Sequence, residues 1–370
     1  MRAMKASTRS ALVFLLLFLA ARAGRAQSPP GDGAQQFAAL GDFKLTSGVV
    51  LRDLRLGYRT MGRLDAAKSN AILWCTHLGG RSESLLQYVG PHNVVDTGRY
   101  FVVLVDAIGN GVSTSPSNSS SQPLMQFPQF TIRDMVEAEH RLVVEVLHLS
   151  HLRAVAGVSM GGMQTFEWAV AYPEFMDLAI PMMGSPQSTS ADKLLWTAAI
   201  DAIELDPAWH NGRPSGAFGP GLALAGEIEF MNMTSPAYRV AHTGPGAFSS
   251  YLAEIREQRR GDAGAACDQV RQRHAILAFD IPGEYGTSLE QAAKRVHAKM
   301  LIVVSPEDHT VNPLPATHFA AAIGAPVVTL DSPCGHISLA CISVGPIVAQ
   351  FLAEPASARS QTLREHSPTD

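Results

Sequence analysis

The sequence is poor in cysteine and carries almost no excess of charge of either sign. Its 370 residues include four cysteines, too few for a chain of this length to depend on a disulfide framework. The formal net charge is -4, and no basic cluster could follow a phosphate backbone. These shortages exclude a small disulfide-stapled scaffold and give no reason to expect nucleic acid as a partner.

Metal-ligand motifs and internal repeats are lacking as well. Histidine and cysteine residues are scattered along the chain rather than paired at the spacings that hold zinc. We therefore expect neither a metal nor a cofactor. Hydrophobic residues make up 46% and charged residues 17% of the chain, which is typical of a globular protein. The length allows one large core and an inserted region.

Long hydrophobic runs are absent except near the N-terminus. Three basic residues precede the apolar run 11–21, and small residues follow it up to Ala23 or Ala26. This order is typical of a secretory signal, and the run is short for a membrane span. We expect residues 1–26 to be a signal peptide and the mature protein to be exported, periplasmic or secreted, without stable membrane insertion. An uncleaved N-terminal anchor is the alternative.

The rest of the chain has the pattern of an α/β fold. Short apolar runs rich in Val, Ile and Leu alternate with amphipathic segments of helix length. This alternation predicts a mostly parallel central sheet with helices on both faces. The predicted divisions are a linker (27–36), a core in two parts (37–185 and 286–355), an insertion between them (186–285) and a flexible tail (356–370).

The insertion differs from the core in composition. Residues 186–285 contain few strand-like runs, Gly-Pro pairs at 219–220 and 244–245, and helical segments such as 248–256. A structureless loop of this length is unlikely inside a compact domain. We interpret the segment as a mostly helical cap over the functional site.

A glycine-flanked serine carries the strongest chemical signal. The motif Gly157-Val158-Ser159-Met160-Gly161 lies between a predicted strand (154–158) and a predicted helix (163–171). At such a turn the serine hydroxyl is exposed at the end of the sheet. Glycine is required on both sides because a Cβ atom would collide with the neighbouring strand or helix. We interpret Ser159 as a nucleophile, the alternative being a glycine-rich turn whose serine caps the helix.

A serine nucleophile needs a base and an acid that orients the base. Asp308 and His336 follow the last two predicted strands, so they are expected at the same edge of the sheet as Ser159. They also follow the serine in the order acid, then histidine. We predict that Asp308 orients His336, with Glu307 as the alternative acid.

The developing negative charge on a carbonyl oxygen needs backbone N–H donors. One is expected from Met160, the residue after the nucleophile. The second is expected from the loop 76–80, where we choose Leu78, with Gly79 as the alternative. His77 in this loop is interpreted as scaffolding.

Two of the cysteines flank the predicted base. Cys334 and Cys341 lie on either side of His336, and an oxidising compartment would permit a bridge between them. Cys75 lies inside an apolar strand and is expected to be a buried thiol.

At these motifs the sequence resembles the homoserine O-acetyltransferase family, a branch of the α/β-hydrolase superfamily. The likeness includes the segments 70–80, 96–101, 106–111, 130–136, 161–164, 167–169 and 172–173. It extends from about Phe43 to Phe351 and weakens through the insertion. The resemblance implies an α/β-hydrolase fold with a helical cap that shapes the acceptor pocket, no metal, and Ser159, Asp308 and His336 as nucleophile, acid and base.

The sequence departs from that family where the acceptor would bind. The family's histidine is typically followed by an aspartate that helps hold the homoserine amino group, whereas Ile337 follows His336 here. The family's cap arginine, which grips the homoserine carboxylate, is replaced by Gly226-Glu227. We expect Glu227 to repel a carboxylate. Acyl-CoA and homoserine are also cytoplasmic, so an exported enzyme would rarely meet them.

These observations favour a carboxylic-ester hydrolase that forms an acyl-enzyme on a small-molecule ester or thioester. The alternative is an O-acyltransferase with an acceptor other than homoserine. A third hypothesis is a binding protein on a retired hydrolase scaffold, which the intact serine, aspartate and histidine argue against. A homodimer is compatible with the sequence.

Overall fold

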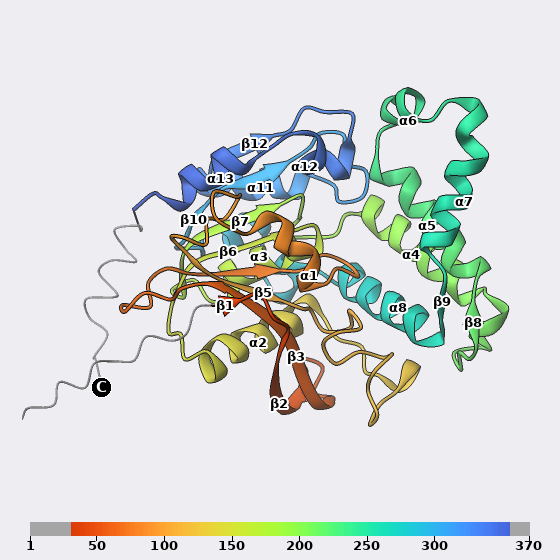
Figure 1. Cartoon of the computed structure of the whole chain (residues 1–370), viewed down its shortest axis with the longest axis horizontal. Coiled ribbons are helices and arrows are strands. Elements are labelled where there is room, and N and C mark those ends of the chain that lie inside the picture. Colours follow the sequence, from red (N-terminus) through yellow and green to blue (C-terminus); the bar gives the residue numbers. More distant parts are fainter. Residues whose placement is uncertain (1–30, 356–370) are drawn as a thin grey trace, which may run out of the picture.

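The computed structural model describes residues 31–355. The predicted signal peptide (1–26), the first residues of the predicted linker and the predicted tail (356–370) lie outside the described residues. The described part consists of a sheet between two helical layers and a helical cap beside them (Figure 1).

The central sheet has ten strands in the order β1-β3-β5-β4-β6-β7-β11-β12, with β2 paired to β3 and β10 paired to β7. The strands are β1 (Gly31–Asp32), β2 (Gln36–Lys44), β3 (Val50–Gly62), β4 (Ala71–Cys75), β5 (Phe101–Val105), β6 (Leu152–Val158), β7 (Met176–Met182), β10 (Lys299–Met300), β11 (Ile302–Val304) and β12 (Val327–Thr329). The pairs of β1, β2 and β5 with β3 are antiparallel. All pairs from β5 to β12 are parallel, so their carboxyl ends share one edge.

The predicted linker, residues 27–36, overlaps the first strand of the structure and the beginning of the second. Gly31 and Asp32 form β1, which pairs with Met61 and Gly62, and β2 begins at Gln36. A Cβ atom on Gly31 would lie 2.4 Å from the Thr60 carbonyl, so this position accommodates glycine at the edge of β3. Glycine and proline suggested a loop, whereas backbone pairing at the sheet edge makes the segment a strand.

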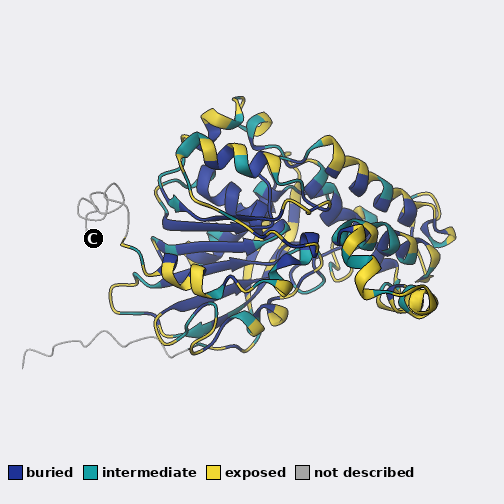
Figure 2. Cartoon of the chain, turned by 90° about the horizontal axis from the view of Figure 1, so that it is seen from above, coloured by how far each residue is buried: buried dark blue, intermediate teal, exposed yellow. Residues whose placement is uncertain are grey.

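Two helical layers cover the sheet. The first layer contains α2 (Ile132–Arg141), α3 (Met160–Ala171), α10 (Leu289–Ala293) and α11 (Leu314–Ile323), and the second contains α1 (Ser82–Leu85), α12 (Ser338–Cys341) and α13 (Gly345–Leu352). Leu73 and Cys75 of β4 face the first layer, and Ile72 and Trp74 face the second, because successive side chains of a strand alternate. Figure 2 shows the buried strands between these helices.

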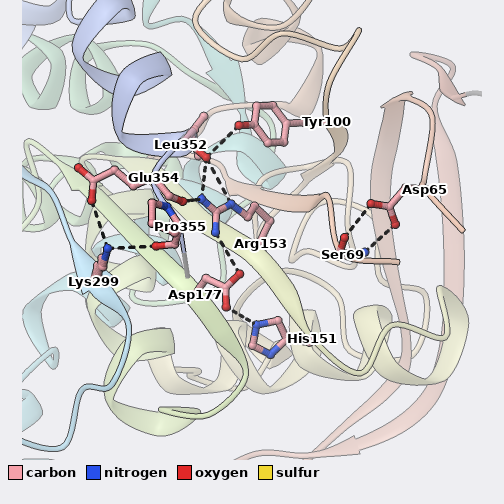
Figure 3. Close-up of polar contacts among 10 residues, drawn as sticks. All are labelled: Asp65, Ser69, Tyr100, His151, Arg153, Asp177, Lys299, Leu352, Glu354 and Pro355. Carbon is pink, nitrogen blue, oxygen red and sulfur yellow. Dashed lines mark hydrogen bonds and ion pairs between the residues drawn. The ribbon is translucent and has the colours of Figure 1, made fainter. Parts of the chain in front are cut away.

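The C-terminal end of α13 is hydrogen-bonded to residues at the amino ends of the parallel strands, the edge of the sheet opposite their carboxyl ends. The carbonyl of Leu352 accepts hydrogen bonds from Arg153 Nη2 at 2.8 Å and from the Tyr100 hydroxyl at 2.9 Å (Figure 3). Arg153 also contacts Asp177 at 3.1 Å, and Lys299 lies 3.4 Å from Glu354. These contacts fix α13 across the starts of β6 and β7, and thus anchor the second layer.

The insertion forms a helical cap with its own small core. Its elements are α4 (Ser190–Glu204), α5 (Pro220–Met233), α6 (Pro236–His242), α7 (Phe248–Gln258) and α8 (Ala263–Leu277), with β8 (Ala217–Phe218) paired to β9 (Gly261–Asp262). Thr189 and Asp192 start α4 with reciprocal capping hydrogen bonds. The cap lies beyond one end of the sheet (Figure 1). The short helix α9 (Ile281–Glu284) follows it and returns the chain to the main core, where Ile281 is buried.

Short helical turns complete the described chain: η1 (Leu86–Tyr88), η2 (Leu124–Gln126), η3 (Leu142–Val146), η4 (Pro207–Trp209), η5 (Pro245–Ala247) and η6 (Gly335–Ile337). Between residues 31 and 355, no single helix is long and apolar enough to cross a membrane. The bent pair Gly335–Cys341 and Gly345–Leu352 passes that test together, by length and composition alone.

Candidate active site

Ser159 occupies a strained turn between β6 and α3. Its backbone has φ 59° and ψ -121°, a region that residues other than glycine rarely adopt. A Cβ atom on Gly157 would lie 2.2 Å from the Gly161 carbonyl oxygen, and one on Gly161 would lie 2.4 Å from the Cys75 carbonyl oxygen. Both glycines of the motif are therefore sterically required, which lets β6, α3 and β4 meet closely around Ser159.

The helix-capping alternative for Ser159 is wrong. Its side chain makes no capping hydrogen bond to α3. Instead Ser159 Oγ lies 2.9 Å from His336 Nε2. The turn is held by its backbone, since the Ser159 N–H donates to the Met182 carbonyl at 2.9 Å. The hydroxyl is thus left to interact with the imidazole.

His336 lies in the turn η6, which follows β12. Gly335 before it has φ 62°, and a Cβ atom there would lie 2.7 Å from the Glu307 carbonyl oxygen. The two ring nitrogens of His336 contact different partners: Nδ1 lies 2.7 Å from Asp308 Oδ2, and Nε2 faces Ser159. The imidazole therefore bridges the carboxylate and the hydroxyl.

Asp308, and not Glu307, is the acid that contacts the histidine. Asp308 is 4% exposed, whereas the Glu307 side chain is exposed and lies 3.8 Å from His309. The structure thus brings Ser159, His336 and Asp308 together at the carboxyl edge of the sheet, as expected for a base oriented by an acid.

A disulfide encloses the His336 turn. Cys334 and Cys341 are bonded, seven positions apart in sequence, while Cys75 and Cys267 are free and buried. The pairing that the sequence left open is therefore present. It joins the residue two positions before His336 to the end of α12.

Within the described part of the chain, the backbone N–H groups of Leu78 and Met160 make no hydrogen bond. The neighbouring Gly79 N–H donates to Gln272 Oε1 at 2.8 Å, so it is occupied by a side chain of α8. Of the two candidates in this loop, Leu78 therefore has the free donor. Gln164 Nε2 donates to the Thr76 carbonyl at 3.0 Å and holds the loop against α3.

His77 lies close to this arrangement without a hydrogen bond to it. The ring packs on Gly80, where a Cβ atom would approach it to 2.6 Å. Burial, and next the proximity of His336, lowers the pKa of His77 below its usual value. A neutral His77 avoids placing a second positive charge beside His336 when the latter accepts a proton.

A cavity of about 280 Å³ opens over Ser159. The core contributes Leu78, Tyr88, Thr310, Ile337 and Leu339 to its wall, and the cap contributes Trp196, Glu229, Met233 and Arg259. The cap residues were not predicted from the sequence. Most of the wall is apolar, and the charged part comes entirely from the cap.

The expectation that Glu227 faces the acceptor is wrong. Glu227 pairs with Arg256 at 2.7 Å on an exposed surface and does not line the cavity. Glu229, two positions further along α5, lines it instead and contacts both Arg259, at 2.9 Å, and the buried Arg273. Residues two apart on a helix face nearly opposite directions, so α5 turns Glu227 outward and Glu229 inward. The cavity wall thus holds one carboxylate and one guanidinium group, and the carboxylate also contacts the buried guanidinium of Arg273.

Among residues 31–355, no group of three or more His, Cys, Asp or Glu side chains could hold a metal ion. The reactive groups at the cavity are an oriented imidazole, a serine hydroxyl and the N–H donors of Leu78 and Met160. This set is suited to attack on a carbonyl carbon.

A serine on a strained strand-to-helix turn, joined to histidine and aspartate at the carboxyl edge of a mostly parallel sheet, defines the class of serine enzymes with the α/β-hydrolase architecture. Residues 78–339 match the family model described as alpha/beta hydrolase fold. The chain belongs to this family, in the branch that contains homoserine O-acetyltransferases and esterases.

Comparison with individual relatives gives the same branch. The chain is 32% identical over 318 residues to the homoserine O-acetyltransferase of Thermobifida fusca, covering 76% of this chain and 82% of that protein. It is 35% identical over 210 residues to the ethyl acetate hydrolase of Pseudomonas veronii, covering 56% of this chain and 60% of that protein. The solved structure of an acetylester hydrolase from Corynebacterium glutamicum superimposes with a TM-score of 0.77 at 25% identity, covering 86% of this chain and 95% of that one.

Proposed function

We propose that this protein is an exported carboxylic-ester hydrolase that acts through an acyl-enzyme on Ser159. The observation that carries the proposal is the continuous contact from Asp308 through His336 to the Ser159 hydroxyl, at 2.7 and 2.9 Å. The substrate is a small-molecule ester or thioester whose carbonyl group lies in the cavity above Ser159. Relatives in the same branch that hydrolyse acetate esters support this choice.

In the first half of the reaction, Ser159 Oγ bonds to the carbonyl carbon while its proton moves to His336 Nε2. The carbonyl π electrons move to oxygen, and the N–H groups of Leu78 and Met160 stabilise that oxyanion. Collapse of the intermediate breaks the bond to the alcohol. The alcohol takes the proton from His336 and leaves, and the acyl group stays on Ser159.

In the second half, water attacks the acyl carbon and gives a proton to His336 Nε2. Collapse of this second intermediate breaks the bond to Ser159 Oγ, which takes the proton back, and the carboxylic acid is released. Asp308 holds the imidazole in the tautomer with the proton on Nδ1 and stabilises its charged form.

The cavity wall favours water over an amino-alcohol acceptor. Ile337, next to His336, offers no carboxylate to an amine. The carboxylate of Glu229 in the wall is already paired with Arg259 and with the buried Arg273, so it is not free to pair with an ammonium group. An acceptor such as homoserine would therefore bind poorly, and hydrolysis would prevail.

An O-acyltransferase with another acceptor is the second candidate. The extended similarity to a homoserine O-acetyltransferase, which spans 82% of that protein, favours it. Both reactions share the acyl-enzyme and differ only in what attacks it. Adding alcohols of increasing size to the assay distinguishes them, because transfer gives a new ester where hydrolysis gives only the acid.

Export rests on the N-terminal sequence pattern and on one structural observation. The basic, apolar and small-residue order of residues 1–26 is that of a secretory signal. The disulfide between Cys334 and Cys341 is of a kind that persists in oxidising compartments. Fractionation of cells that produce the full chain, followed by mass determination of its N-terminus, tests this part of the proposal.

The test of the enzymatic proposal is release of p-nitrophenol from acetyl, butyryl and octanoyl esters, with Ser159→Ala as the control. Hydrolysis that is lost in Ser159→Ala supports a serine mechanism. A folded protein that releases nothing and is not labelled by a fluorophosphonate would support the third hypothesis, a binding protein on a hydrolase scaffold.

A further inference from the structure

A second cavity lies beside the active-site cavity and plays no part in the reaction steps above. Its volume is about 310 Å³, within the range of roughly 300–1,000 Å³ that is usual for small-ligand pockets. Much of its wall is formed by Trp74, Val94, Met182, Leu339, Val344 and the disulfide-bonded Cys341. No charged side chain lines it, in contrast to the cap side of the first cavity.

The two cavities adjoin at the nucleophile. They share four lining residues, Tyr88, Val158, Leu339 and Ala340. Val158 directly precedes Ser159, so the second cavity begins within one residue of the serine. A group bound to the carbonyl carbon at Ser159 can therefore extend past these shared side chains into the second cavity.

The walls of the second cavity come from well-fixed parts of the fold. Trp74 at the end of β4 and Met182 at the end of β7 are each 2% exposed and belong to the core of the second layer. Trp74 stacks on Tyr88, with ring centroids 5.9 Å apart. The disulfide from Cys334 to Cys341 spans α12, which carries Leu339. The cavity is thus a preformed apolar space.

We propose that this second cavity binds a flexible apolar chain of the substrate, so that the preferred substrates are esters with a chain considerably longer than acetyl. This proposal rests on the proposed function and names its substrate class. Uncharged, mostly apolar walls gain free energy from methylene groups and none from a charged substituent. Each methylene that enters the cavity is expected to raise kcat/KM about fourfold until the space is filled.

The chain could belong to the acyl half or to the alcohol half of the ester, and two substrate series distinguish them. The first consists of p-nitrophenyl esters from acetate to dodecanoate, and the second of alkyl acetates from ethyl to dodecyl. A rise of kcat/KM through about the octyl length in the first series supports the proposal and assigns the acyl chain. The same rise in the second series supports it and assigns the alcohol chain. Flat or falling profiles in both series overturn it.

Variants in the second cavity test whether the preference arises there. Val94 and Ser343 line this cavity but not the first, and Ser343 lies at its exposed rim. Val94→Trp and Ser343→Trp are each expected to lower the octyl-to-acetyl ratio of kcat/KM at least tenfold. Val240→Trp, at a position 79% exposed on α6, introduces the same side chain elsewhere and is expected to leave the ratio unchanged. An unchanged ratio in both cavity variants would overturn the proposal.

The experiments separate failure of this inference from failure of the proposed function. Hydrolysis of acetate esters with no chain-length preference would leave the proposed function standing and reject the chain site. If no ester is hydrolysed, alkylboronic acids, which bond reversibly to serine hydroxyls, give a readout without turnover. A larger rise in melting temperature with octylboronic than with methylboronic acid would then support the chain site, and equal rises would reject it.

Discussion

Asp308 uses its two carboxylate oxygens for two different tasks, one of which is its contact with His336. Oδ2 lies 2.7 Å from His336 Nδ1, while Oδ1 accepts hydrogen bonds from the N–H groups of Thr310 and Val311, each at 2.9 Å. The backbone bonds fix the carboxylate, and the carboxylate in turn fixes the imidazole. The orientation of His336 is therefore determined by the loop after β11.

Replacing Asp308 by asparagine is expected to lower kcat by about 10³–10⁴-fold. The amide can still accept from the backbone, but it favours the tautomer of His336 that cannot accept the Ser159 proton. The matched control is Glu307→Gln, at the exposed neighbouring acid, which is expected to change kcat less than twofold. Steady-state kinetics on a p-nitrophenyl ester measure both. A larger loss in Glu307→Gln than in Asp308→Asn would contradict the assignment.

Replacing Gly161 by alanine is expected to destabilise the protein by about 3 kcal/mol. The new Cβ would lie 2.4 Å from the Cys75 carbonyl oxygen, a backbone atom that cannot turn aside as the end of a flexible side chain could. Gly246→Ala is the control, because nothing lies within 4 Å of a Cβ atom at that position of η5. Urea unfolding of the two variants gives the free energies. Equal stabilities would show that the motif tolerates a side chain there.

The fold and the residues in contact with Ser159 were predictable because their signals are local. The strained turn needs glycines at fixed spacing, and Asp308 and His336 each lie in the loop that follows a strand. Even so, the predicted strand 300–304 is interrupted at Leu301 and thus divided into β10 and β11, although both parts keep the same register along β7. Apolar composition alone does not predict that interruption.

A helical cap was predicted, but the cap residues that line the active-site cavity and the second cavity were not predictable, because they depend on the rotation and placement of elements far apart in sequence. Glu229 faces the cavity only because of the rotation of α5, and Arg259 reaches it from the end of α7. The second cavity combines Trp74, Val94 and Met182 with the start of α13. None of these residues forms a motif with the others along the chain.

Removing the disulfide with Cys334→Ser and Cys341→Ser is expected to cost about 2–3 kcal/mol of stability, since it closes a short loop seven positions long. Activity should fall as well, because His336 lies inside that loop. Dithiothreitol should lower the melting temperature and activity of the wild type and leave the double variant unaffected. If reduced wild type retained full activity, the bridge would have no part in positioning His336.

Glu139 is expected to make stability fall as the pH rises. Complete burial raises its pKa from 4.5 to about 7, although Trp168 Nε1 donates to it at 2.8 Å. Between those two values the folded state holds a proton that the unfolded state has lost, so stability decreases across that interval and then levels off. Glu139→Gln removes this titration, and its stability relative to wild type should improve by up to about 3 kcal/mol between pH 4.5 and pH 8.

The control for Glu139 is Glu145→Gln, at the exposed end of the same helical segment. Pairing with Arg141 lowers the pKa of Glu145, so its titration has the opposite sign. Its relative stability should not improve as the pH rises. Urea unfolding at several pH values measures both variants, and parallel curves for Glu139→Gln and wild type would reject the role assigned to Glu139.

The two glutamates of α5 should respond very differently to the same substitution. Glu229→Gln leaves Arg273, which is 1% exposed, without its only carboxylate partner among the described residues, and a buried unpaired charge costs about 3–5 kcal/mol. Glu227→Gln breaks only the exposed pair with Arg256, which is worth about 0–1 kcal/mol. Thermal and urea unfolding compare the two variants. Because Glu229 also lines the cavity above Ser159 and Glu227 does not, only the first change should also alter KM. If the two variants had equal effects on stability and on KM, Glu229 could not face the cavity while Glu227 faces away from it.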